Sequence, residues 1–296
     1  MSRYVPKEIT EEVNTTPVHP LVNLANLFAT VAVVGLLVYA GLGFAASQLV
    51  MRLGPQTEER IGEMTTAALP VQMAEEDSRV DYLSDLLAAI EADASQDHSA
   101  RQYPPLKVGI LPMPQENAMV TAGSYLFVTD GLLAAVESEN ELAFVLAHEL
   151  GHLENRDPLK ALGRSLVLVT MSAALGIGGQ SNSTAIPSAA NFAELSYSRE
   201  QEIAADDYAI QQVIRRYGHG GESLGFFERN RELELGGAIG DAFGRVAEWQ
   251  QTHPLSSKRI ERLAAQFERN GWAKTGEITP LPEFIHCPNF EPCGDL

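Results

Sequence analysis

The longest apolar stretch of the chain runs from Phe28 to Val50 and contains no charged residue. As an α-helix it would extend about 35 Å, which exceeds the roughly 30 Å hydrocarbon core of a bilayer. A buried helix of a soluble protein usually carries polar residues every few positions. A signal peptide has an apolar region of only ~7–15 residues behind a short basic start. We therefore expect residues 28–50 to span a lipid bilayer as an anchor, although Ala45-Ala46-Ser47 leaves cleavage open.

The basic residues do not decide in which direction this segment crosses the membrane. Arg3 and Lys7 precede it, and Arg52 and Arg60 follow it, so the positive-inside count is a tie. We expect a single-pass protein whose main domain lies on the extracytoplasmic (periplasmic) side. A reporter fused to the C-terminus would test this orientation.

Beyond the anchor, shorter patterns predict a mostly helical α+β domain. Val80, Leu83, Leu87 and Ile90 follow helical spacing within an acidic stretch, and we assign residues 51–100 to an acidic helical neck. Short apolar runs bounded by turn residues then predict three strands, and longer periodic patterns predict helices. The strands are expected at Leu106–Leu111, Ala118–Val120 and Tyr125–Thr129, and the helices at about 139–155, 159–176, 191–217, 223–235, 241–251 and 257–270.

These elements divide the chain into an N-terminal tail (1–27), the anchor, the neck, a domain over 101–275 and a Pro-rich C-terminal tail (276–296). The first long helix of the domain begins with Ser138 and Glu141 at the spacing of a capping box. The apolar segment at 165–179 is too short to span a bilayer. We expect it to be buried, to act as a lid or to lie on the membrane surface, with a Gly/Ser-rich loop at 178–190 beside it that can gate access.

Composition narrows the classes of function. Asp and Glu total 39 against 21 Lys and Arg, which gives a net charge of −18. Because this charge repels phosphate backbones, we expect no nucleic-acid partner. The two cysteines, Cys287 and Cys293, are too few for a disulfide-rich scaffold or a four-cysteine zinc module. They could form a disulfide with each other or stay reduced.

The candidate chemistry begins in the first long helix, which contains His148-Glu149-Leu150-Gly151-His152. Residues four apart lie on the same face of a helix, so the two imidazoles can share one metal ion, usually Zn²⁺. Glu149, beside the first histidine, can then reach a water bound to the metal. The surrounding helix is apolar, and such polar groups are costly there unless a metal or hydrogen bonds satisfy them.

A catalytic zinc needs a third protein ligand and one open position. The helix expected at 191–217 carries Glu202 and Asp206, which are four residues apart and share a face. Glu202 can be the third ligand, and Asp206 can accept a hydrogen bond from the free ring nitrogen of His148. Small residues between them would let the two helices approach closely. Glu200 and Asp207 are local rivals that we expect at the surface.

Further blocks accompany these residues in a fixed order between about Leu106 and Ile260. Together they resemble the HtpX-like and CAAX-prenyl-protease-like group of membrane-associated gluzincin zinc metallopeptidases. The blocks are Asn117-Ala118, Gly123, YLFVT at 125–129, Gly131-Leu132-Leu133, Glu139–Ala143, HELGH at 148–152, Asn155-Arg156-Asp157, Ser198-Arg199, Glu202, Ala205-Asp206, Thr252-His253-Pro254 and Arg259-Ile260.

The resemblance implies a zincin-like fold that holds one zinc ion through His148, His152 and Glu202, with Glu149 as the general base. It also implies that the hairpin at 118–129 supplies an edge strand to which a peptide can add. His253 occupies the position of a histidine that can stabilise the tetrahedral oxyanion, whereas Arg259 is expected to be an ion-pair partner.

The sequence therefore predicts a membrane-anchored zinc endopeptidase that acts on protein or peptide substrates, in quality control of unfolded or membrane-associated proteins. One alternative is a metal-binding chaperone or assembly factor whose peptidase activity is latent or autoinhibited. Another is a membrane scaffold without metal. Processing of prenyl peptides is disfavoured, because the resemblance would then imply many membrane helices that this chain lacks.

Overall fold

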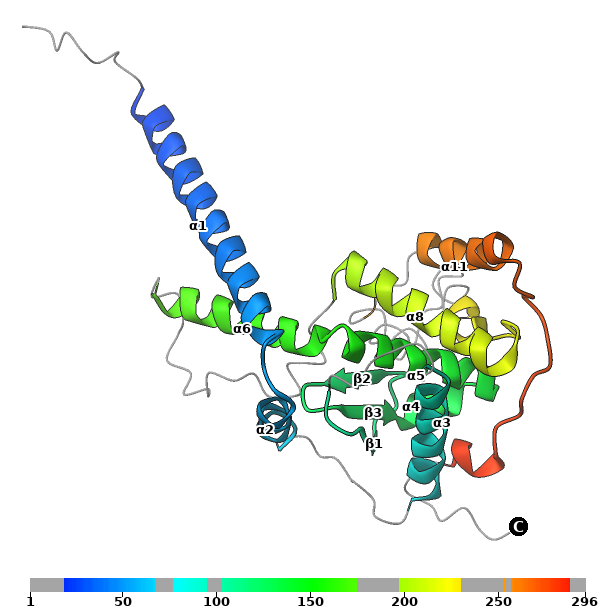
Figure 1. The fold of residues 1–296 in the computed structure, drawn as a ribbon. Helices are drawn as coiled ribbons and strands as arrows, with labels where there is room; N and C mark the ends of the chain where they lie inside the picture. Colours follow the sequence, from blue (N-terminus) through cyan, green and yellow to red (C-terminus); the bar gives the residue numbers. More distant parts are fainter. Residues whose placement is uncertain are drawn as a thin grey trace, which may run out of the picture.

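The computed structural model describes residues 19–67, 77–94, 103–174, 197–229, 253 and 257–287. In these residues a small sheet lies against a layer of helices, and one long helix extends away from the rest of the molecule (Figure 1). The expectation of a mostly helical α+β fold with a small sheet is confirmed.

The projecting helix is α1 (Pro20–Val50), and it contains the whole predicted anchor. It begins earlier than the predicted anchor, because His19 caps its N-terminus by accepting a hydrogen bond from the Leu21 amide and Pro20 occupies the first turn. Its large apolar side chains are exposed along almost its full length. Length and apolar character suffice for α1 to cross a membrane.

Two helices follow, α2 (Pro55–Thr66) and α3 (Ser78–Ala94). The predicted apolar face of α3 is confirmed, because Leu83, Leu87 and Ile90 are buried in the main hydrophobic core and Val80 packs at its margin. This face contacts two long helices of the domain and its first strand. The acidic positions of α3 that separate these residues point away from the core.

The sheet consists of β1 (Lys107–Leu111), β2 (Ala118–Thr121) and β3 (Tyr125–Thr129), in the spatial order β1-β3-β2. β1 pairs with β3 in parallel, and β2 pairs with β3 as an antiparallel hairpin. The turn between β2 and β3 has positive φ at Gly123 and Ser124, a conformation that glycine adopts without strain. All three predicted strands are present, and β2 lies at one edge of the sheet.

Within the described part of the domain, the helices are α4 (Asp130–Ala135), α5 (Glu139–Glu154), α6 (Asp157–Ala174), α8 (Arg199–Tyr217) and α11 (Ser257–Asn270), and a short 3-10 helix follows at Glu283–His286. α11 has the predicted bounds. α8 begins later than expected, because Ser198 forms a capping box with Gln201. Of the other predicted elements, the loop at 178–190, the helix at 241–251 and most of the helix at 223–235 lie outside the described residues.

The capping box expected at the start of α5 forms only in part. The Ser138 hydroxyl accepts from the amide of Glu141 as predicted. The Glu141 carboxylate does not return to Ser138 but accepts from the Glu137 amide and binds the guanidinium of Arg229. The prediction was wrong on this side chain because a charged partner from a distant segment competes with the local amide.

α5 lies at the centre of the domain, and all its residues from Asn140 to Leu153 are buried. It packs closely along α8 (Figure 1). A side chain at Gly151 would place its Cβ 2.9 Å from the Cα of Ala205, so the absence of a side chain at this point allows the close approach. The histidines of α5 therefore face α8 across a short distance.

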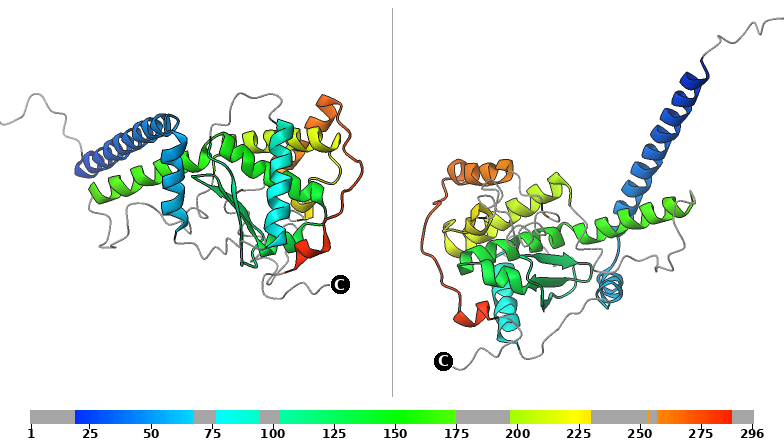
Figure 2. Two further views of the ribbon diagram at one scale, coloured as in Figure 1. Left: turned by 60° about the horizontal axis from the view of Figure 1, so that its bottom comes forward. Right: turned by 180° about the vertical axis from the view of Figure 1, so that it is seen from behind.

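α6 leaves the domain beside α1, and the two helices contact each other where α1 ends (Figure 2). An added Cβ at Gly163 would lie in ordinary contact with Ala46 and Val50. Beyond this contact the two helices diverge (Figure 1), and Val169 of α6 is exposed. In the C-terminal tail, Ile285 of the 3-10 helix is buried in the main core. Cys293 lies outside the described residues, so the pairing of the two cysteines stays an open prediction.

Candidate metal centre

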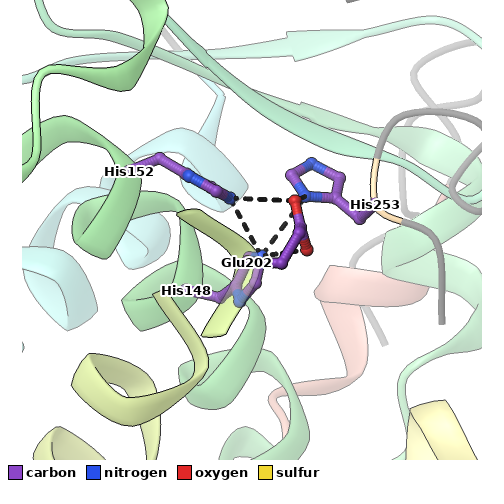
Figure 3. Close-up of side chains that lie close together, drawn as sticks. All are labelled: His148, His152, Glu202 and His253. Atoms are coloured by element: carbon purple, nitrogen blue, oxygen red, sulfur yellow. Dashed lines mark hydrogen bonds and ion pairs between the residues drawn. The ribbon is translucent and has the colours of Figure 1, made fainter. Parts of the chain in front are cut away.

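Four side chains from three segments meet in the interior of the domain (Figure 3). His148 and His152 lie one turn apart on α5, Glu202 lies on α8, and His253 precedes α11. All four are buried, and one ligand atom from each lies within 4.8 Å of the others. The structure therefore brings together the predicted ligands and the predicted downstream histidine.

Two carboxylates orient the rings of the first two histidines. Nδ1 of His148 lies 3.2 Å from Oδ1 of Asp206, and Nδ1 of His152 lies 3.1 Å from Oδ2 of Asp157. Because a carboxylate only accepts hydrogen bonds, Nδ1 of His152 carries the proton and donates it to Asp157, and Nδ1 of His148 faces Asp206 in an ion-pair contact. The two Nε2 atoms are then left to face each other at 3.2 Å.

Such an arrangement fits a bound cation. Two Nε2 atoms at this distance require a positive charge between them, which is either a proton carried by one ring or a bound metal ion. The carboxylate of Glu202 approaches the same point, with Oε1 3.5 Å from Nε2 of His152 and Oε2 3.6 Å from Nε2 of His148. Two imidazoles and a carboxylate are the protein ligands of many catalytic zinc sites.

The carboxylates of the site stay ionised. Burial alone would raise the pKa of Glu202, but the imidazoles of His253, His148 and His152 hold it well below its usual range. Burial would likewise raise the pKa of Asp206, which His148 and Arg259 lower instead. The site thus keeps negative charge available for a cation at neutral pH.

Arg259 of α11 joins the two carboxylates of α8. Its Nη1 lies 2.6 Å from Oε2 of Glu202, while Nε and Nη2 donate to Asp206 at 2.9 and 2.7 Å. This bidentate pair fixes the plane of the Asp206 carboxylate that His148 uses. The expectation that Arg259 is an ion-pair partner is confirmed.

Glu149 is fully buried beside this cluster. Among the described residues, neither of its carboxylate oxygens has a hydrogen-bond partner. Nε2 of His253 lies 3.4 Å from its Oε1. A buried carboxylate without donors is costly, so its environment fits a bound water molecule that completes the site.

His253 lies between Glu149 and the ligands. Its Nδ1 is 3.1 Å from Oε1 of Glu202 and 3.3 Å from Nε2 of His148. Burial lowers the pKa of His253, against the opposing effect of Glu202 and Glu149, so the ring is neutral at pH 7. One nitrogen therefore points towards the ligand cluster, and the other points towards the expected base.

Glu200 and Asp207, the two alternative carboxylates on α8, lie away from the cluster. Glu200 is exposed and Asp207 pairs with Arg262 at the surface, as expected of the two rivals. Sequence reasoning missed Asp157, although it follows His152 closely at the start of the next helix, and Tyr197. The Tyr197 ring stacks on His152 with centroids 4.0 Å apart, a contact for which the sequence holds no local signal.

Comparison with known proteins places these residues in a wider group. Residues 84–266 match the family model "Peptidase family M48". The chain is 27% identical over 164 residues to the mitochondrial metalloendopeptidase OMA1 of Saccharomyces cerevisiae, covering 52% of this chain and 44% of that protein. It is 34% identical over 116 residues to a protease HtpX homolog of Salinibacter ruber, covering 34% and 42%.

A third relative is the metalloprotease LoiP of Escherichia coli, which is 27% identical over 161 residues, covering 52% of this chain and 60% of that protein. The chain thus spans less than half of the length of the first two relatives. The matched family region includes α5, α8 and His253, and it begins within α3.

Proposed function

The chain belongs to peptidase family M48, and from this premise we propose that it is a membrane-anchored, zinc-dependent endopeptidase. We further propose that it serves protein quality control by hydrolysing unfolded or membrane-associated proteins. The observation that carries the proposal is the meeting of His148, His152 and Glu202 at one buried point beside an unsatisfied Glu149.

The zinc ligands in this proposal are His148, His152 and Glu202. Asp206 positions His148, and Asp157 positions His152, each through the ring nitrogen that faces away from the cluster. When bound, zinc supplies the Lewis acidity that activates water near neutral pH and polarises a peptide carbonyl.

Glu149 acts as the general base. Its carboxylate accepts a proton from the attacking water and passes that proton to the leaving amine. Its oxygens are free for this role, because the carboxylate is fully buried and no donor among the described residues forms a hydrogen bond to it. His253 is placed to donate a hydrogen bond to the carbonyl oxygen as negative charge develops on it.

The substrate is proposed to bind along β2. This strand pairs with β3 on one side, and it contacts α5, the helix that carries the histidines. An extended peptide can add to such an edge through main-chain hydrogen bonds, which depend little on side-chain identity. Broad specificity of this kind suits unfolded proteins.

α1 provides the attachment to the membrane. Its exposed apolar surface would be unfavourable in water and is covered by a lipid bilayer. We propose that the domain lies on the extracytoplasmic side. An alkaline-phosphatase fusion at the C-terminus tests this orientation, because that reporter is active only outside the cytoplasm.

Hydrolysis of an unfolded protein tests the activity. The purified full-length chain in detergent should cleave casein, and a chelator should abolish the cleavage until zinc is restored. Glu149→Gln should keep one zinc per chain but lose activity by a factor of about 10²–10⁴, the usual contribution of a general base. An active Glu149→Gln protein would remove this assignment.

The position of His253 favours a second candidate, a metal-binding chaperone or assembly factor with latent peptidase activity. Its Nδ1 lies among the ligand atoms, where it can occupy the position that water or substrate requires. His253→Ala distinguishes the candidates. A catalytic His253 predicts slower casein cleavage by the variant, whereas a latent enzyme predicts faster cleavage.

A further inference from the structure

A buried arginine that follows α5, Arg156, binds the segment of chain between α1 and α2. The guanidinium of Arg156 donates to the carbonyl oxygens of Met51 and Leu53 at 3.3 and 3.1 Å. It also forms a short ion pair with the carboxylate of Glu58 in the first turn of α2. Arg156 is 4% exposed and Glu58 is 1% exposed.

A small apolar cluster adjoins this ion pair through Leu53, whose carbonyl oxygen binds Arg156, and is separate from the main core. It joins Val50 at the end of α1, Ala122 in the hairpin turn and Leu159 of α6, with Leu53 and Ile61 packed against them. We call these residues, with Glu58 and Arg156, the junction. It joins the end of α1, α2, the hairpin turn and the start of α6.

The junction also includes a close approach of two backbones. A Cβ at Gly62 of α2 would lie 2.3 Å from the carbonyl oxygen of Ala122, and a Cβ at Gly123 would lie 2.8 Å from the Cα of Gly62. Lys107 of β1 adds an ion pair to Glu59 at 2.7 Å. α2 is therefore seated directly on the turn of the hairpin that ends the edge strand β2.

Arg156 occupies a strained place in the chain. Its φ of 54° lies in the left-handed region, which non-glycine residues enter only when their surroundings impose it. The residue follows the last turn of α5 and immediately precedes Asp157, whose carboxylate accepts from His152. Arg156, which binds Glu58, and Asp157, which orients His152, are therefore adjacent in the chain.

We propose that Glu58 and Arg156 are positioning residues that tie the membrane helix and α2 to the end of the metal helix and thereby hold Asp157 against His152. The proposal rests on the proposed zinc peptidase function. In this proposal, the segment from Met51 to Glu58, directly after the anchor, helps to hold the proposed zinc ligand His152 in place. The order of contacts is Glu58 to Arg156, Arg156 to Asp157 along the chain, and Asp157 to His152.

General stability is a weak reason for such an ion pair. A buried pair often contributes no more to folding than apolar residues of the same volume, because both charges lose their hydration. What the pair supplies is a fixed direction for the guanidinium, which meets two carbonyl oxygens of the connection between α1 and α2 and the carboxylate of Glu58. That fixed direction orients the backbone on which Asp157 lies.

The test uses the full-length protein in detergent and the variant Glu58→Gln. Its control is Glu63→Gln, which makes the same change in charge on the exposed side of the same helix. Three quantities are measured: the zinc dissociation constant by competition with a chelator, the visible absorption of the Co²⁺-substituted protein, and kcat and KM for a casein-derived peptide.

Loss of a residue that orients a ligand weakens metal binding by about 10–100-fold, and Glu58 acts on the orienting residue Asp157 through Arg156. We therefore expect Glu58→Gln to weaken zinc binding about tenfold, to change the Co²⁺ spectrum and to lower kcat about tenfold with KM within about twofold of the wild type. Glu63→Gln should match the wild type in all three. Equal zinc affinity in Glu58→Gln and wild type would overturn the proposal.

Arg156→Gly separates positioning from backbone strain. Glycine adopts the left-handed conformation freely, so this variant removes the guanidinium while relieving the strain. We expect it to weaken zinc binding at least as much as Glu58→Gln does, and wild-type affinity would overturn the proposal. Far-UV circular dichroism checks folding, and should Arg156→Gly fail to fold, Arg156→Lys replaces it under the same expectation.

Failure of the proposed function is recognised separately. If the wild-type protein shows no chelator-sensitive hydrolysis, the peptidase assignment fails, whereas zinc affinity and the Co²⁺ spectrum still test the junction. If hydrolysis occurs and Glu58→Gln behaves as Glu63→Gln does, the positioning role fails and the peptidase assignment stands.

Discussion

Asp206→Asn tests how the outer carboxylate supports the proposed zinc site. Asp206 is 1% exposed and binds both Nδ1 of His148 at 3.2 Å and Arg259 at 2.7 and 2.9 Å. Asparagine keeps the shape of the side chain but has a single acceptor oxygen and no charge. It can therefore satisfy either His148 or Arg259, and the other partner loses its contact.

Removing such a partner costs about 10–100-fold in metal affinity. With about 1.36 kcal/mol for each factor of ten, this corresponds to roughly 1.4–2.7 kcal/mol of zinc binding free energy. The value belongs at the upper end, because Arg259 also binds Glu202 at 2.6 Å and its displacement would disturb a proposed ligand as well. Competition with a chromophoric chelator measures the zinc dissociation constant directly.

Asp207→Asn is the matched control. It changes the charge of the neighbouring residue by the same amount, but Asp207 pairs with Arg262 at the surface, where ion pairs contribute little. We expect its zinc affinity to stay within about twofold of the wild type. Wild-type affinity in Asp206→Asn, or an equal loss in Asp207→Asn, would refute the reasoning, because the effect would then depend on net charge alone.

Two further predictions concern protons and packing. Burial alone would lower the pKa of His148, but Asp206 and Glu202 raise it to about 9, so zinc must displace a proton and its affinity should rise about tenfold for each pH unit from pH 7 to 8.5. The protonated ring also stabilises the metal-free fold below pH 6.5, and that contribution is lost as the pH rises through about 9; a pH-independent zinc affinity would contradict this assignment. Gly151→Ala should lower the free energy of unfolding by ~1–3 kcal/mol, because its Cβ would lie 2.9 Å from the Cα of Ala205. Gly163→Ala, whose Cβ meets only ordinary contacts, should not lower it, and guanidinium titrations followed by circular dichroism compare the two.

Sequence patterns predicted those elements that depend on local signals. The strand Tyr125–Thr129 and the helix Ser257–Asn270 have the expected bounds, because a bounded apolar run and a strongly amphipathic repeat leave few alternatives. The metal cluster was predictable for a similar reason. Helical geometry places residues four apart on one face, so His148 and His152, and likewise Glu202 and Asp206, could be paired before any contact was known.

Local sequence patterns could not predict contacts between residues that are far apart in the sequence. Glu141 was expected to complete a local cap, yet its carboxylate binds Arg229 from another part of the chain. The role of Asp157 depends on where the chain turns after α5, and that turn requires a left-handed Arg156 held by Glu58. No local pattern encodes an ion pair between residues so far apart in the sequence.

Zinc content measured by elemental analysis tests the central claim most directly. Full-length protein purified with zinc available should carry one zinc per chain, and Glu202→Ala should carry almost none, because it removes the ligand that joins α8 to the two histidines of α5. A wild-type protein without zinc, or a Glu202→Ala variant that retains a full equivalent, would contradict the proposed site.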